Sequence, residues 1–246
     1  ITLCSTDAAA DLFTELGGTP DAGGTWSGPS TLASGSFDPA TMTAGDYVYT
    51  VVGTAPCPDE TATVTVSVNT PPDSGTDGSI TLCSSDAASS LFAQLGGTPD
   101  AGGTWSGPSA VVGGMINPAT MLAGAYIYTV AGTAPCPDET ATVTVVINTP
   151  PDPGTDGAIT LCSTDAAADL FTELGGAPDA GGTWSGPSTL ADGSFNPATM
   201  TAGNYVYTVA GTAPCPDETA TVTVTVNTPP DAGTDGSITL CSTDAA

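Results

Sequence analysis

An internal repeat of 79 residues sets the strongest limit on how this chain can fold. The letters ITLC occur at residues 1, 80, 159 and 238, so the 246 residues hold three full repeats and the start of a fourth. Self-similarity at a fixed period is typical of arrays of small, similar domains. We therefore expect one domain with its linker in each of residues 1–79, 80–158 and 159–237, and the start of another in residues 238–246. Because neither end coincides with a domain edge, we expect the chain to be a window on a longer periodic polymer.

The charged residues exclude several classes of function. The chain has 26 Asp and Glu residues and no Lys, Arg or His, which gives a formal net charge of −26. Nucleic-acid binding depends mainly on cationic side chains, so it is effectively excluded. Most catalytic bases, amine nucleophiles and imidazole metal ligands are also missing, and only paired carboxylates remain for acid/base chemistry. We expect the protein not to be an enzyme.

The hydrophobic pattern within each repeat predicts mainly β-strands. Residues 61–69, TATVTVSVN, alternate between apolar and hydroxyl side chains, and residues 46–52, DYVYTVV, also alternate. Strict alternation is typical of half-buried strands, and the eight residues GTAPCPDE between them predict a long hairpin. Residues 6–18, TDAAADLFTELGG, instead predict a short helix with Thr6 as N-cap and Gly17 at its end. Two β-sheets packed face to face, with this helix over one end, are the expected architecture.

Several motifs of the repeat also resemble a known family. GTWSG, F-D/N-P, AG-x-Y-x-Y and C…TVTV occur together along the unit. This combination resembles the immunoglobulin-like repeats of very large secreted and surface-anchored proteins of Bacteroidota, of the gliding-motility and adhesin type that the type 9 system secretes. The resemblance implies an extracellular, all-β protein whose tandem immunoglobulin-like domains form an extended rod. The TAGDY stretch is similar to the tyrosine corner of such sandwiches, with Tyr47 as its tyrosine.

The aromatic residues have two interpretations. Trp26, Trp105 and Trp184 are either core residues between the sheets or sugar-stacking platforms, one in each repeat. Small sandwiches commonly bury one tryptophan, so the core interpretation is favoured for the tryptophans and tyrosines alike.

The seven cysteines predict disulfides within the repeats. Each repeat has two, and Cys241 is left over. We expect the last strand, which starts at Thr61, to run parallel to the first, so that Cys4 and Cys57 meet at one pole of the sandwich. The whole last strand, about 30 Å, separates Cys57 from Cys83. The predicted pairs are Cys4–Cys57, Cys83–Cys136 and Cys162–Cys215. Disulfides imply an extracellular or cell-surface location.

The linkers combine proline with acidic residues. Residues 69–79, NTPPDSGTDGS, predict a short, semi-rigid joint, and their spacing does not fit an EF-hand. If domains stack end to end, carboxylates from the linker and from the next pole gather at each joint. They either bind calcium, which prefers oxygen ligands, or stay solvated and repel one another. The candidate ligands are Asp73, Asp77, Asp86, Asp138 and Glu139 at the first joint and Asp152, Asp156, Asp165, Asp217 and Glu218 at the second.

These patterns favour a structural function. We expect a segment of a long extracellular filament or adhesin stalk, whose partners are further copies of the repeat in the same chain and neighbouring chains in a fibre. The alternative is a multivalent module with one weak glycan or protein site in each repeat, because tandem copies raise avidity.

Overall fold

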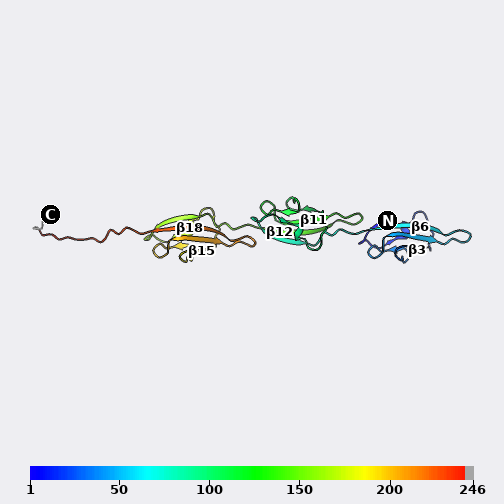
Figure 1. The fold of residues 1–246 in the computed structure, drawn as a ribbon, viewed down its shortest axis with the longest axis horizontal. Helices are drawn as coiled ribbons and strands as arrows, with labels where there is room; N and C mark the ends of the chain where they lie inside the picture. Colours follow the sequence, from blue (N-terminus) through cyan, green and yellow to red (C-terminus); the bar gives the residue numbers. More distant parts are fainter. Residues whose placement is uncertain (242–246) are drawn as a thin grey trace. The chain divides into compact units, whose positions relative to one another are not determined.

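The computed structural model describes residues 1–241, so the last five residues of the expected fourth repeat lie outside the described part. Each 79-residue repeat forms its own group of strands, which Figure 1 marks with the labels β3 and β6, β11 and β12, and β15 and β18. The protein is all-β, with tandem domains of the immunoglobulin-like sandwich type, as the sequence predicts. No helix within residues 1–241 is long and apolar enough to cross a membrane.

The first repeat contains a four-stranded sheet and a two-stranded sheet. The larger sheet has the order β1-β6-β5-β3, and β2 pairs with β4 in the smaller one. Its elements are β1 (Thr2–Cys4), β2 (Ala10–Asp11), the 3₁₀ helix η1 (Leu12–Glu15), β3 (Thr25–Ser27), β4 (Ser36–Phe37), β5 (Gly45–Val51) and β6 (Glu60–Asn69). Strand β1 runs parallel to β6, with Cys4 opposite Asn69, whereas β5 runs antiparallel to both β6 and β3.

The other two repeats use the same elements in the same order. The second has the sheet order β7-β12-β11-β9, and the third has β13-β18-β17-β15. The second consists of β7 (Gly78–Cys83), β8 (Ser89–Ser90), η2 (Phe92–Gln94), β9 (Thr104–Ser106), β10 (Met115–Ile116), β11 (Gly124–Val130) and β12 (Glu139–Asn148). The third consists of β13 (Gly157–Cys162), β14 (Ala168–Asp169), η3 (Leu170–Glu173), β15 (Thr183–Ser185), β16 (Ser194–Phe195), β17 (Gly203–Val209) and β18 (Glu218–Asn227).

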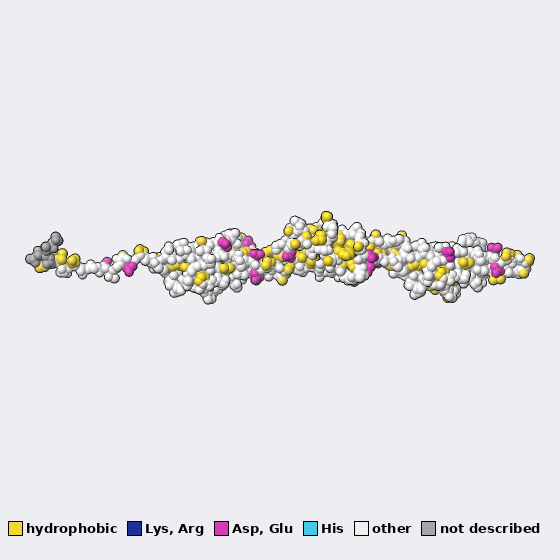
Figure 2. Space-filling model, viewed as in Figure 1, with side chains coloured by type: hydrophobic (Ala, Val, Ile, Leu, Met, Phe, Trp, Pro, Cys, Tyr) yellow, Lys and Arg dark blue, Asp and Glu magenta, His cyan; other side chains and the backbone are white. Residues whose placement is uncertain are grey.

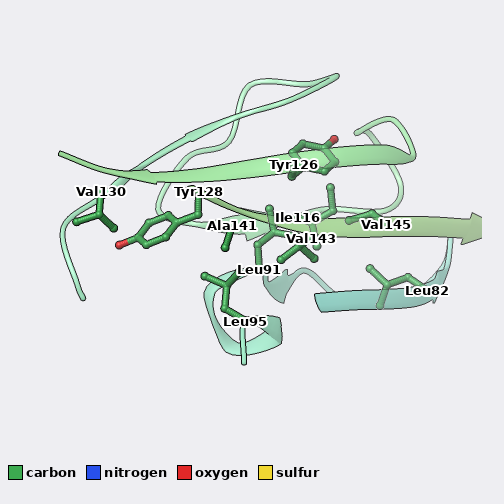
Figure 3. Close-up of a cluster of buried hydrophobic side chains, with 10 residues drawn as sticks. All are labelled: Leu82, Leu91, Leu95, Ile116, Tyr126, Tyr128, Val130, Ala141, Val143 and Val145. Atoms are coloured by element: carbon green, nitrogen blue, oxygen red, sulfur yellow. The ribbon is translucent and has the colours of Figure 1, made fainter. Parts of the chain in front are cut away.

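Alternation along the strands builds the core of each domain. In β12, Ala141, Val143 and Val145 are at most 2% exposed, while the threonines between them lie on the other face. Figure 3 shows these side chains, with Tyr126 and Ile116, in the space between the sheets of the second repeat. Burying such side chains provides the main stabilisation of a small sandwich.

A tyrosine corner fixes one end of each domain. The Tyr47 hydroxyl donates to the carbonyl of Thr43 at 2.7 Å, and Tyr126 and Tyr205 make the corresponding bond four residues upstream. A Cβ at Gly28 would lie 2.4 Å from the Tyr47 ring, so glycine is needed for this close approach. The resemblance to a tyrosine corner is therefore confirmed in the geometry.

The predicted helix at residues 6–18 is shorter than expected. Only the four residues of η1 form a 3₁₀ turn, and its N-cap is Asp11, whose carboxylate accepts from the Phe13 amide at 3.0 Å. The preceding residues Ala10 and Asp11 instead pair with Phe37 and Ser36 as a strand. Isolated short helices are only marginally stable, so pairing with the second sheet outweighs the local helix signal.

The chain divides into two compact units that do not coincide with single repeats. The first comprises residues 1–82 and 86–147, which are the first repeat and most of the second. The second comprises residues 83–85 with residues 148 onward, so the third repeat carries a short piece of the second.

Candidate functional site: the strap and the disulfide

Two disulfides connect different repeats, so the predicted pairing is wrong. Cys4 bonds to Cys136 and Cys83 bonds to Cys215, each across a sequence separation of 132 residues. None of the three pairs Cys4–Cys57, Cys83–Cys136 and Cys162–Cys215 forms. Cys57 is an exposed thiol, and Cys162 is a half-buried one.

Strand register explains this error. Strand β1 runs parallel to β6, as expected, but it pairs with the end of β6, so Cys4 lies opposite Asn69, whereas Cys57 lies before β6 begins. The ten residues of β6 separate the two cysteines by about 30 Å at roughly 3.3 Å per residue. A cysteine at the end of β1 therefore reaches only the hairpin of the following repeat.

Within the first unit, residues 73–77 of the linker lie against the second repeat. We call this segment, together with residues 152–156 and 231–235, the strap. Thr76 and Gly96 exchange two backbone hydrogen bonds, at 2.9 and 3.0 Å. The Asp73 carbonyl accepts from the Asp100 amide at 2.7 Å, and the Asp73 amide donates to the Asp100 carboxylate at 2.9 Å. The Asp77 carboxylate accepts from the Thr142 amide at 2.7 Å.

Within the second unit, the strap of residues 152–156 makes the same contacts with the third repeat. Thr155 and Gly175 exchange two backbone hydrogen bonds, and the Asp152 carbonyl accepts from the Asp179 amide at 2.7 Å. The Asp156 carboxylate accepts from the Thr221 amide at 2.8 Å. The linkers thus form part of the following domain.

A hairpin tip completes each joint. The Asn69 side-chain amide donates to the carbonyl of Ala134 at 2.8 Å, two residues before Cys136. In the second unit, Asn148 makes the same bond to Ala213 at 2.7 Å, beside Cys215. Each joint therefore combines a disulfide, an asparagine contact and a strap.

The joints contribute to stability as well as to connectivity. On the chain-entropy account, a crosslink across 132 residues stabilises the folded state by about 5 kcal/mol. Each strap hydrogen bond contributes about 0.5–1.5 kcal/mol more. A joint held by these contacts has much less freedom than a flexible linker.

The predicted carboxylate cluster is not assembled at either joint. Asp77 binds the Thr142 amide, while Asp138 binds the Gly132 amide at 2.9 Å in its own hairpin. Among residues 1–241, no group of three or more His, Cys, Asp or Glu side chains is placed to hold a metal ion. Backbone amides are the partners of Asp77 and Asp138, and Figure 2 shows the acidic side chains in small separate groups. The ten candidate ligands thus do not form the calcium cages that end-to-end stacking predicts.

The Cys162 thiol has an altered acidity. A hydrogen bond from the Thr164 hydroxyl, 3.2 Å from the sulfur, lowers the pKa of Cys162 below its usual value. A lower pKa populates the thiolate, which is the form that attacks disulfides. In the first repeat, the Thr6 hydroxyl makes the same contact with the Cys4 sulfur at 3.3 Å. A threonine hydroxyl thus lies beside the cysteine that ends the first strand in both repeats.

The tryptophans lie at the edge of the core. Trp26, Trp105 and Trp184 are half-buried, and each packs against a tyrosine ring with centroids 5.0–5.1 Å apart. Trp105 and Trp184 line grooves of about 560 Å³, and the groove at Trp26 measures about 360 Å³. One part of each indole thus packs on the core while the other faces a groove.

Sequence reasoning missed the strap contacts, although a signal for them was present. The pattern D-x-G-T-D-G is identical in all three linkers, while the position after the first aspartate changes from Ser74 to Pro153 and Ala232. In the two joints, both aspartates and the threonine of this pattern bind the next domain.

Comparisons with known proteins show similarity of fold only. The sequence matches no protein-family model and no curated protein. An I-band fragment of titin is similar, with a TM-score of 0.48 and 14% identity over 92% of this chain and 95% of that chain. The insect immune protein hemolin has a TM-score of 0.39 and 13% identity over 74% of this chain and 56% of that chain. Extracellular domains 3–5 of Drosophila OTK have a TM-score of 0.38 and 14% identity, covering 75% of this chain and 71% of theirs.

Proposed function

We propose that the chain is a structural segment of a long extracellular filament or adhesin stalk, in which immunoglobulin-like repeats are joined by crosslinked joints. The observation that carries this proposal is the recurrence of one joint, with its disulfide, asparagine and strap, at both repeat boundaries. A protein that acts by catalysis does not need such joints, whereas one that carries load or holds a distance does. Its partners are further repeats of the same kind, in the same chain and in neighbouring chains.

The chemistry of the chain supports an extracellular location. Disulfides persist in oxidising compartments, and both joints depend on one. The formal charge of −26 favours solubility, because like-charged surfaces repel one another. The motifs shared with surface repeats of Bacteroidota point to the same setting, and we extend the proposal to that class of protein.

Proteolysis of the straps tests this function with a control inside the same chain. An endoproteinase that cleaves on the amino side of aspartate can attack all three copies of the strap. The first two have backbone partners in the next domain, whereas residues 231–235 are exposed. For a load-bearing segment we expect rapid cleavage at Asp231 and Asp235 and slow cleavage at the four joint aspartates, followed by mass spectrometry. Equal rates at all three straps would contradict rigid joints and the stalk function.

A multivalent glycan-binding function is the second candidate. The half-buried tryptophan beside a groove in each repeat favours it, because an exposed aromatic face is a typical platform for apolar ligand surfaces. Glycan-array binding that the Trp105→Ala and Trp184→Ala variants lose would support this function. Absence of binding by the intact chain would leave the tryptophans with a packing role.

A further inference from the structure

Each repeat has an aromatic groove beside its tryptophan. In the third repeat, Phe171, Trp184 and Tyr207 line the groove, and both Phe171 and Trp184 pack against the Tyr207 ring, with centroids 5.4 and 5.1 Å apart. The second repeat has the same three types of aromatic residue around a groove of the same volume, about 560 Å³. The grooves of these two repeats are therefore matched in size and in aromatic surface.

The grooves differ in charge. Asp169 and Asp192 line the groove of the third repeat, and both side chains are exposed. Asp11 lines the groove of the first repeat. The second repeat has Ser90 and Gly113 at the two positions, and within residues 1–241 no acidic side chain lines its groove. The third, first and second grooves thus carry two carboxylates, one and none.

One of these carboxylates lies beside the indole ring. A Cβ at Gly193 would be 3.1 Å from Trp184 Nε1 and 3.2 Å from Asp169 Oδ1, so both atoms border the same point of the groove wall. The Phe171 amide donates to Asp169 Oδ1 at 3.0 Å, which holds the carboxylate in place and leaves its other oxygen able to accept. The first repeat has the same arrangement around Gly35, at the same two distances.

The lining of the third groove suits a planar cation. Aromatic faces attract cations through the ring quadrupole, and carboxylates add charge attraction. None of the 246 residues is Lys, Arg or His, so these repeats supply no cationic side chain of their own. A guanidinium group is planar, stacks on aromatic rings, is less strongly hydrated than an ammonium group and pairs with carboxylates through its N–H groups. An arginine side chain is therefore the cation that this groove fits best.

We propose that the aromatic groove of the third repeat binds an arginine side chain of a partner protein. The guanidinium group stacks against Trp184 and donates to the carboxylates of Asp169 and Asp192. The first groove, with Asp11 alone, binds the same group less tightly, and the second groove binds it least. This inference goes beyond the stalk function, which the joints carry, and it assigns the grooves a ligand other than a glycan.

A titration of the full chain with a blocked arginine tests the proposal. The probe is N-acetylarginine amide, and its control is N-acetylcitrulline amide, which has the same length but an uncharged urea. Two-dimensional NMR of the ¹⁵N-labelled chain gives one indole N–H signal for each repeat, because each repeat has one tryptophan. Single Trp→Phe variants assign these signals. We expect the third groove to bind the arginine probe at least about fivefold more tightly than the second groove, and molar salt to remove this difference.

The second repeat supplies the design of the variants. Asp169→Ser with Asp192→Gly gives the third groove the residues of the second, and should reduce its affinity for the arginine probe to that of the second groove. Serine is also a good N-cap, so the melting temperature should change little. Ser90→Asp gives the second groove one carboxylate and should raise its affinity.

A matched control removes a charge outside the groove. Glu173 is not part of the lining of the third groove, and the second repeat has Gln94 at this position. Glu173→Gln should therefore leave the affinity of the third groove for the arginine probe unchanged. A loss equal to that of the Asp169 and Asp192 variant would show a general charge effect and overturn a site in the groove.

Other results would also overturn the proposal. They are equal affinities of the three grooves for the arginine probe, binding of the citrulline probe as tight as that of the arginine probe, and indole signals that the arginine probe does not move. Indole signals that move with a neutral glycan but not with arginine would refute it in favour of glycan binding. The stalk function survives each of these results, because proteolysis of the straps tests it separately.

Discussion

The two disulfides overlap in sequence, which gives the chain a short load-bearing path. From Cys4, force passes across the first disulfide to Cys136, back along the chain to Cys83, and across the second disulfide to Cys215. The stretch from 83 to 136 contains 53 residue steps, whereas the direct route from 4 to 215 contains 211. At about 3.5 Å per residue, the fully unfolded path between Cys4 and Cys215 is about 190 Å when oxidised and about 740 Å when reduced.

Single-molecule force spectroscopy on the chain held by its two ends measures this difference. Removing one crosslink gives an intermediate length. In the Cys4→Ser, Cys136→Ser double variant, force follows the chain from residue 4 to 83 and then crosses the second disulfide, a path of 79 residue steps. We therefore expect the oxidised double variant to extend about 90 Å further than the wild-type chain.

The Cys57→Ser variant is the control that distinguishes the possible pairings. Bonds within the repeats would give a wild-type path of 52 residue steps, almost the same as the observed pairing. Under the observed pairing, Cys57→Ser leaves the extension unchanged, because Cys57 has no disulfide. A gain of about 190 Å in this variant would show that Cys57 is bonded to Cys4, and the pairing derived from the structure would be refuted.

Three further predictions concern single sites. Tyr205→Phe removes the hydroxyl bond to the Thr201 carbonyl and should lower the free energy of unfolding by about 1 kcal/mol in a urea titration; no change would mean that water replaces the bond fully. Because the pKa of Cys162 is lowered, iodoacetamide should still alkylate Cys162 at pH values where an ordinary thiol no longer reacts. Thr164→Ala should shift the midpoint of this rate–pH profile to higher pH. An unchanged midpoint would exclude the Thr164 hydroxyl as the cause of the lowered pKa. Millimolar calcium should leave the melting temperature unchanged relative to chelator at equal ionic strength, since the joint carboxylates are dispersed; a clear rise would restore the calcium hypothesis.

The strands and the domain type could be predicted from local sequence. Alternation in residues 61–69 depends on the side-chain period of a strand, so the pattern alone identifies β6 and its buried face at Val64 and Val66. Tyr47 was also identifiable, because its bond to Thr43 spans only four residues. The short helix was overestimated because Ala10 and Asp11 have a distant partner in β4.

The joints could not be predicted in the same way. The sequence supplies two cysteines for each repeat and an unchanged D-x-G-T-D-G linker, but it does not state which repeat a side chain faces. The register of β1 against the end of β6 places Cys4 at the far end of the domain from Cys57, where the next hairpin can reach it. Residue types and their period thus determined the domains, whereas strand register, a property of the assembled sheet, decided which cysteines bond.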